Sequence, residues 1–234
     1  MKLTINTPAG KYRYKYKPIF LGIKPINKTI AKENLLLLKK ILDSHNVLFF
    51  LAFGTLLGAV REHDFITHDE DIDLIMFKSD MPKFLSLLFV LRQHGFEIAR
   101  YERRGFLSII RKGEYIDFYF FDDYPEDNTL VYCCRDLYPK AEFLDHTTIE
   151  FQGTEFTAPR NYTKYLEFNY GTNWRTPIPY VNFEMSRLAK AKHITMQYIK
   201  IFLPTKLTEK LQKHSDKPFL EKWEKKIREF DFKA

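Results

Sequence analysis

The 234-residue chain has only two cysteines, and they are neighbours, Cys133 and Cys134. Adjacent cysteines are poorly placed for an ordinary disulfide, so the sequence contains no disulfide framework like that of small secreted domains. It also lacks an uncharged apolar run of roughly 18 residues, the length that spans a bilayer, and a charged-then-apolar leader. These absences predict a soluble cytoplasmic protein, with the inner face of the membrane as an alternative location.

The composition predicts one folded domain, alone or with a helical appendage. The chain is 45% hydrophobic and 29% charged, which argues against disorder, and its length suffices for a sizeable core. The net charge of +7 indicates an anionic partner. Basic residues gather at 11–17 and beyond Thr205, whereas acids gather at 69–80 and 117–127. For each basic end taken alone, a solvated lysine face is the simpler interpretation.

The pattern of apolar residues predicts an α+β architecture. Helical spacing and end signals indicate helices over 28–45, 55–61, 80–95, 159–170, 183–202 and 216–230. Extended segments are expected at 47–53, 72–77, 96–102, 106–111 and 115–121, with a small hairpin at 148–157. We expect residues 96–121 to form an antiparallel meander and 122–127 a loop. The proline-containing segment 172–182 is the best candidate boundary between a sheet-containing core and helical packing.

Two acids in the second expected strand form a candidate metal site. Asp71 and Asp73 are two positions apart, so they project from the same side of a strand, about 7 Å apart at the backbone. Left alone in apolar surroundings they would repel one another, and a divalent cation removes that conflict. Mg²⁺ is the expected ion, with Mn²⁺ as an alternative, because hard cations prefer oxygen ligands.

Asp117 is the candidate for a third ligand. It is the single acid within the otherwise apolar and aromatic segment 115–121, and a buried acid needs a partner. It could bind a second metal ion or accept the proton of an attacking hydroxyl. An ordinary ion pair with an arginine such as Arg111 is the structural alternative.

A turn ahead of the acids is suited to binding phosphate. Gly54 lets the backbone approach a ligand, and Thr55 adds a hydroxyl and could cap the following helix. Arg61 could clamp a phosphate or pair with Asp69. We expect a structural role for His68, because it has no companion at zinc-ligand spacing.

The same residues resemble the LicD family, which includes bacterial phosphocholine transferases and is related to fukutin and fukutin-related protein. The matching segments are Gly54–Arg61 (GTLLGAVR), Phe65–Ile66 and Asp69–Asp73 (DEDID), with a weaker match over 159–177. Where the family usually has Pro-Trp and a middle Asp, this chain has Thr67-His68 and Glu70.

The resemblance implies a nucleotidyltransferase-like fold, a mixed β-sheet flanked by helices, over residues 1–180 with an N-terminal extension. Residues 181–234 would form a C-terminal helical segment packed on this core. It also implies transfer of a phospho-alcohol, phosphocholine above all, from a CDP-activated donor to a sugar hydroxyl of a cell-surface glycan or lipopolysaccharide. Asp71, Asp73 and Asp117 would be catalytic and metal-binding, and Gly54, Thr55, Arg61 and Asp69 would bind substrate.

Two other functions are considered. The same fold could transfer a nucleotidyl group to a protein, an RNA or a small molecule. Alternatively, the basic ends could hold a membrane or nucleic acid without catalysis, although the paired acids argue against this and nucleic acid is the less expected partner. For a choline-bearing donor, an aromatic cage is expected. Tyr115, Tyr119, Tyr170 and Trp174 are its candidates.

Overall fold

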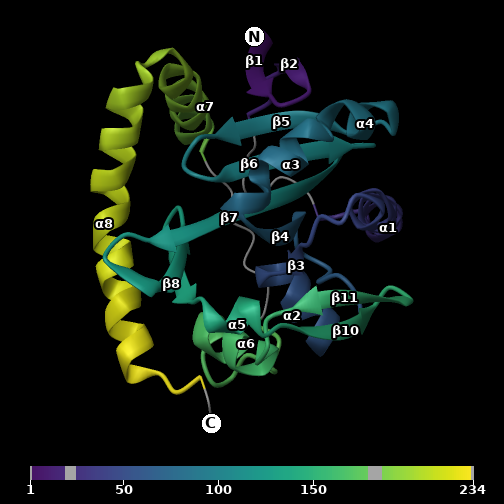
Figure 1. Ribbon diagram of the computed structural model, residues 1–234, viewed down its shortest axis with the longest axis vertical. Coiled ribbons are helices and arrows are strands. Elements are labelled where there is room, and N and C mark those ends of the chain that lie inside the picture. The colour runs from purple at the N-terminus through teal and green to yellow at the C-terminus, as the bar shows by residue number, and fades with distance from the viewer. Residues whose placement is uncertain (1, 19–24, 179–185, 233–234) are drawn as a thin grey trace.

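A mixed β-sheet forms the centre of the computed structural model, which describes residues 2–18, 25–178 and 186–232 (Figure 1). The main path of this seven-stranded sheet runs in the order β3, β4, β7, β6, β5. These strands are β3 (Phe50–Leu51), β4 (Asp71–Phe77), β7 (Glu114–Tyr124), β6 (Phe106–Arg111) and β5 (Glu97–Glu102). Only β4 and β7 pair in parallel along this path, and the others are antiparallel, which confirms the predicted mixed sheet and the meander.

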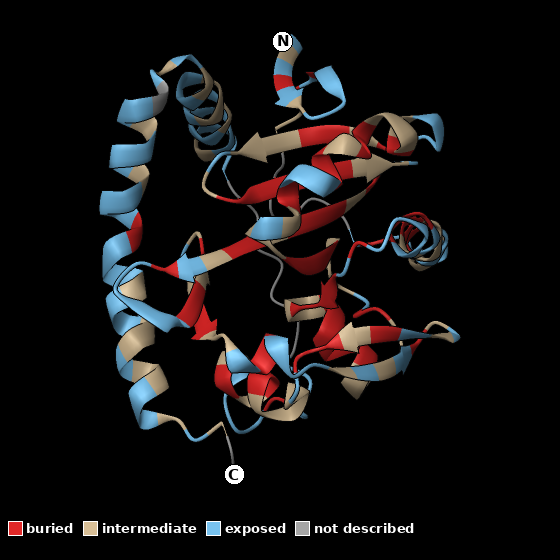
Figure 2. Ribbon diagram, in the orientation of Figure 1, coloured by how far each residue is buried: buried red, intermediate tan, exposed pale blue. Residues whose placement is uncertain are grey.

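Helices flank the sheet and bury its apolar faces (Figures 1 and 2). They are α1 (Lys28–Ser44), α2 (Phe53–Arg61), α3 (Met81–Ser86), α4 (Leu88–Gln93), α5 (Ala141–Leu144) and α6 (Tyr162–Tyr170), with a 3₁₀ turn at Lys78–Asp80. Phenylalanines fill much of the interface, and Phe84, for example, packs against Phe118 and Phe120 of β7. Burial of these rings supplies the main driving force for holding the helices on the sheet.

Several strands differ from the sequence-based prediction. The apolar run 47–53 contributes only β3, because α2 begins at Phe53, whose positive φ of 41° turns the chain sharply. The expected loop at 122–127 is instead the end of β7 and its turn into β8 (Asp127–Cys133), which pairs with β9 (Asp136–Pro139). The basic N-terminal segment forms a hairpin of β1 (Lys2–Thr7) and β2 (Gly10–Lys15). The predicted hairpin at 148–157 is confirmed as β10 (Thr147–Phe151) and β11 (Thr154–Ala158).

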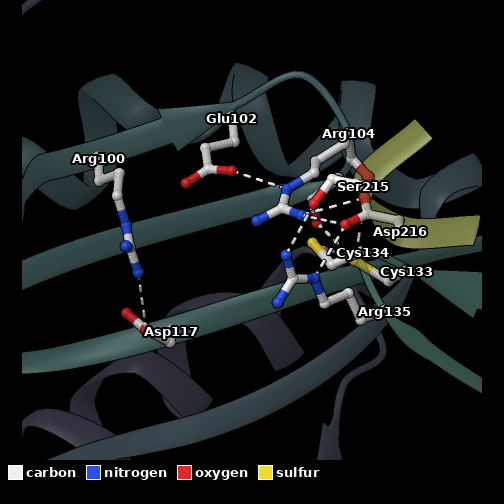
Figure 3. A network of polar contacts seen from close by, with 10 residues as sticks. Arg100, Glu102, Arg104, Asp117, Cys133, Cys134, Arg135, Ser215 and Asp216 are labelled. Atoms are coloured by element: carbon white, nitrogen blue, oxygen red, sulfur yellow. Dashed lines mark hydrogen bonds and ion pairs between the residues drawn. The ribbon is translucent and has the colours of Figure 1, made fainter. Parts of the chain in front are cut away.

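Two long helices complete the described chain. They are α7 (Arg187–Phe202) and α8 (Thr205–Glu229), and α8 begins eleven residues before the predicted start and continues through Pro218. Asp216 holds α8 to the sheet by accepting hydrogen bonds from Arg104 and Arg135 (Figure 3). Trp223 then packs on Phe168 of α6. The start of the predicted 183–202 helix and part of the 172–182 boundary lie outside the described residues.

Within the described ranges, no helix is both long enough and apolar enough to cross a bilayer.

Candidate active site

The fold brings the three predicted acids together on neighbouring strands. Asp71 and Asp73 lie at the beginning of β4, and Asp117 lies directly opposite Asp73 on the parallel strand β7. Residues opposite one another in adjacent strands share a face of the sheet, as do residues two apart in one strand. Asp71, Asp73 and Asp117 therefore occupy one face, as the sequence predicted.

Helix α2 fixes the position of Asp73. The Thr55 hydroxyl accepts a hydrogen bond of 2.8 Å from the Asp73 backbone N–H, and the Ala52 N–H donates to the Asp73 carbonyl at 3.2 Å. Thr55 is 1% exposed, so its hydroxyl orients β4 instead of reaching a ligand. The cap prediction for Thr55 is wrong, because α2 begins two residues earlier, after Ala52, and has no side-chain cap.

Gly54 lies in close contact with the Asp69 side chain. A β-carbon at position 54 would lie 2.3 Å from the Asp69 Oδ2 atom, far inside van der Waals contact. Asp69 is held in turn by the Glu70 backbone N–H, which donates to Oδ1 at 3.1 Å. Position 58 is similarly restricted, since a β-carbon there would lie 2.6 Å from the Asp64 carbonyl oxygen. The two motif glycines thus let α2 pack tightly against the acidic loop.

Burial makes the charged form of every acid in this cluster unfavourable. The pKa of Asp73 is raised well above its ordinary value by burial and then by the charges of Asp71 and Asp69, and a hydrogen bond from the Gly54 backbone partly offsets the shift. The pKa of Asp71 is raised by burial and next by Asp117. Burial likewise raises the pKa of Asp69 to about 6. Such a group of mutually repelling carboxylates is stabilised by an added cation.

Arg100 on β5 is the residue of this site that the sequence reasoning missed. Its guanidinium lies 3.5 Å from Asp117 Oδ2 (Figure 3). It also lies 4.2 Å from the centroid of the Phe106 ring. Burial raises the pKa of Asp117 to about 6, and Arg100 lowers it in part. Asp117 Oδ1 is buried and has no hydrogen-bond partner among the described residues. The structural alternative, an ion pair of Asp117 with an arginine, is therefore present, but its arginine is Arg100. Arg111 instead bonds Glu33 and Asn34 of α1.

The donor set suits a hard divalent cation. Carboxylate oxygens are the ligands that Mg²⁺ and Mn²⁺ prefer, and Asp71, Asp73 and Asp117 present them on one face of the sheet. Within the part of the chain that the structure describes, however, no three such side chains already converge on one point. A cation that used all three acids would therefore require a shift of these side chains.

A cavity of about 560 Å³ begins at Gly54, the residue that lies against Asp69, although the acids themselves do not line it. Gly54, Arg61 and His68 line one side, and Tyr170 and Trp174 line another. Arg61 donates to Glu62 at 2.7 Å and to the Trp174 carbonyl at 3.2 Å, so among the described residues it does not pair with Asp69, one of its two predicted roles. Its Nε atom is buried and without a partner among the described residues.

The four aromatic residues considered for a cage are separated by the fold. Tyr170 and Trp174 line the cavity, whereas Tyr119 packs between the rings of Phe53 and Phe106. Tyr115 lies opposite Asp71 on β7 and is not among the residues that line the cavity. Tyr170 and Trp174 are therefore the aromatic residues best placed to contact a ligand there.

The chain is similar in sequence to known proteins. The ribitol 5-phosphate transferase FKRP of Homo sapiens is 28% identical over 187 residues, which is 71% of this chain and 35% of that protein. The ribitol-5-phosphate transferase FKTN of Macaca fascicularis is 29% identical over 160 residues, 63% of this chain and 34% of that protein. The chain thus spans about a third of the length of these relatives.

A solved structure, that of the antibiotic-resistance factor ANT(2'')-Ia, aligns with a TM-score of 0.43 and 13% identity, covering 82% of this chain and 94% of that one. The sequence also matches the LicD/FKTN/FKRP nucleotidyltransferase domain over residues 46–161, a range that contains all seven predicted site residues. This stretch of the chain belongs to the LicD/FKTN/FKRP family of nucleotidyltransferase domains.

Proposed function

We propose that this protein transfers a phospho-alcohol from a CDP-activated donor to a sugar hydroxyl of a glycan or glycolipid, with Mg²⁺ as cofactor. The observation that carries the proposal is the set of three acids on one face of β4 and β7, with a cavity that begins at the nearby Gly54. Two relatives are named as ribitol-phosphate transferases, which supports this reaction class for the chain.

In this proposal, Asp71 and Asp73 hold the metal, which when bound neutralises the negative charge of the donor diphosphate. The Gly54 backbone lies next to the acids, where a diphosphate can approach closely. Arg61 is at the cavity wall with an unpartnered Nε that can donate to a phosphate oxygen. Asp117 serves as a further ligand or as the acceptor of the sugar hydroxyl proton.

The bond changes follow from this arrangement. The acceptor oxygen forms a bond to the phosphorus that carries the alcohol, and the bond from that phosphorus to the bridging oxygen breaks, which releases CMP. The hydroxyl proton passes to a base, for which a carboxylate with a pKa of about 6, such as Asp117, is suited near neutral pH. In-line approach of the two substrates is the protein's main contribution.

The alcohol is proposed to lie in the cavity between α2 and the segment 170–178. Tyr170 and Trp174 there suit a quaternary ammonium group, which aromatic faces attract, and so phosphocholine is our first choice. Ribitol phosphate, suggested by the relatives' names, is the second.

The test is to identify the released nucleotide product. Purified protein is incubated with Mg²⁺ and, in turn, CDP-choline, CDP-ribitol, CTP and ATP, each with a panel of glycan acceptors. The proposal predicts CMP from one CDP-alcohol and no turnover in the Asp73→Asn variant. Pyrophosphate release from CTP or ATP, with the nucleotide retained on the acceptor, would show nucleotidyl transfer instead and overturn it.

A further inference from the structure

The junction of α7 and α8 exposes large apolar side chains. Ile199 and Phe202 end α7, Leu207 and Leu211 begin α8, and their exposed fractions are 43%, 73%, 43% and 52%. We call these four residues the apolar tip. They lie at one end of the long axis of the molecule, where α7 and α8 meet (Figure 1). Exposed apolar residues gathered in this way are characteristic of a contact surface.

The inward faces of α7 and α8 already contact other parts of the protein. On α7, Tyr198 packs edge-on against Tyr16 of the N-terminal segment, and Gln197 accepts a hydrogen bond from the Tyr16 hydroxyl. On α8, Asp216 and Trp223 face the sheet. Helical spacing therefore places Leu207 and Leu211, one turn apart, on the side of α8 opposite Asp216. Leu207 and Leu211 therefore face away from the core, and Phe202, one turn after Tyr198 at the end of α7, is 73% exposed.

Positive charge surrounds the apolar tip. Between Arg187 and Lys213 the chain has seven lysines and arginines and one acid, Glu209. Lys200, Lys206 and Lys210 are exposed beside the four apolar residues. The β1–β2 hairpin at the same end of the molecule adds Lys11, Arg13 and Lys15, all exposed because the intervening tyrosines point inward (Figures 1 and 2).

We propose that the apolar tip and its lysines bind the surface of an anionic lipid bilayer. Lysines beside outward-facing leucine, isoleucine and phenylalanine match a headgroup layer above acyl chains, because the charges stay at the phosphates while the apolar groups enter below them. Nucleic acid would pair with the lysines but would leave the apolar residues in water. With no helix of the described chain suited to spanning a bilayer, binding is at the surface. This proposal does not depend on the metal site.

The test measures binding of the full-length protein to vesicles. The protein should sediment with vesicles of 70% phosphatidylcholine and 30% phosphatidylglycerol. Vesicles of pure phosphatidylcholine should bind about tenfold less protein. The double variant Phe202→Ser/Leu207→Ser should lose about tenfold or more in affinity, because each side chain gives up its burial in the bilayer. The variant Lys206→Glu/Lys210→Glu should lose a similar amount on anionic vesicles alone.

Matched control variants test whether a loss of vesicle binding is specific to the apolar tip and its lysines. Leu144→Ser, an equally exposed apolar residue on α5, and Lys32→Glu/Lys40→Glu on α1 should bind as the unaltered protein does. Asp73→Asn should also bind normally, which separates this surface from the active site. A Phe202→Trp variant should show stronger fluorescence quenching by brominated lipids than the parent protein.

Three results would overturn the proposal. The first is binding to anionic vesicles that the Phe202→Ser/Leu207→Ser variant retains. The second is tight binding to a nucleic acid duplex that the same double variant does not weaken. The third is a concentration-dependent dimer that the double variant abolishes, which would show that a second copy covers the apolar tip.

Discussion

Asp73 lies where three elements meet: β4 carries it, α2 fixes its backbone through Thr55, and β7 places Asp117 beside it. The same contacts that position the carboxylate also remove it from water and set it near other acids, which raises its pKa. The metal-free protein is therefore less stable than it would be with a neutral side chain at position 73. Such a conflict between stability and geometry is typical of functional sites.

Replacing Asp73 by Asn tests this conflict directly. Without metal, Asp73→Asn should raise the melting temperature by about 2–4 °C, as expected when roughly 1 kcal/mol of repulsion is removed from a domain of this size. It should also abolish the rise in melting temperature produced by Mg²⁺ with CDP-choline. Differential scanning calorimetry measures both. The control is Asp43→Asn, which changes an exposed acid on α1 and should alter neither.

Gly54→Ala should destabilise the protein by about 1–3 kcal/mol, because the new methyl group collides with the Asp69 carboxylate. Urea unfolding of Gly54→Ala, Asp69→Ala and the double variant gives the coupling between the two positions. Removing the carboxylate makes space for the methyl, so the double variant should be less destabilised than the sum of the single changes. Strictly additive effects would contradict the close contact.

At the scale of elements, the spacing of apolar residues in the sequence predicted those strands and helices in which that spacing is regular. The period of two in β4 placed Asp71 and Asp73 on one face, and the lone acid in an aromatic strand identified Asp117. By contrast, Arg100 gave no signal, since its importance comes only from the pairing of β5, β6 and β7. The basic residues at 11–17 alternate with tyrosines, as in a strand, but a solvated face was the simpler interpretation of this basic end, and the β1–β2 hairpin was not predicted.

The last helix shows why helix ends are difficult to predict. Pro218 predicts a helix that begins at about residue 216, because proline has no backbone N–H to bond within a helix and is favoured in the first turn. In the structure α8 continues through it, and Asp216, two residues earlier, is bonded by Arg104 and Arg135. A tertiary contact therefore overrides the local signal.

Asp216→Ala should loosen α8 without unfolding the sheet. It leaves the Arg104 guanidinium with one anionic partner, Glu102, and should cost about 2–3 kcal/mol of local stability. Hydrogen exchange across Thr205–Glu229 should accelerate while β4 and β7 keep their protection. Glu221→Ala, on the exposed side of the same helix, is the control. Unchanged exchange in α8 would show that Asp216 does not anchor it.

For the whole molecule, buried acids give stability a distinctive dependence on pH. Burial raises the pKa of Asp69, Asp117 and Asp136 each to about 6. A raised pKa means that the folded state binds protons more tightly than the unfolded chain, so the free energy of unfolding falls as pH rises from about 4 to about 6. The metal-free protein should therefore be more stable at pH 5 than at pH 7.

Added Mg²⁺ should reverse part of this trend, because deprotonated carboxylates bind the ion and protonated ones do not. Urea unfolding at pH 5 and pH 7, with EDTA or with Mg²⁺, measures the effect, and the gain from Mg²⁺ should be larger at pH 7. Asp136→Asn should flatten the metal-free dependence without changing the gain from Mg²⁺. Metal-free stability that rises from pH 5 to pH 7 would contradict the burial of these acids.

Binding of Mn²⁺ in the presence of CDP tests the central claim most directly, since it asks whether Asp71 and Asp73 hold a cation that in turn holds a diphosphate. Isothermal titration should show Mn²⁺ binding that CDP tightens in the unaltered protein. Asp71→Asn and Asp73→Asn should each abolish that tightening, whereas Asp43→Asn should retain it. Equal Mn²⁺ and CDP binding in all four proteins would contradict the account.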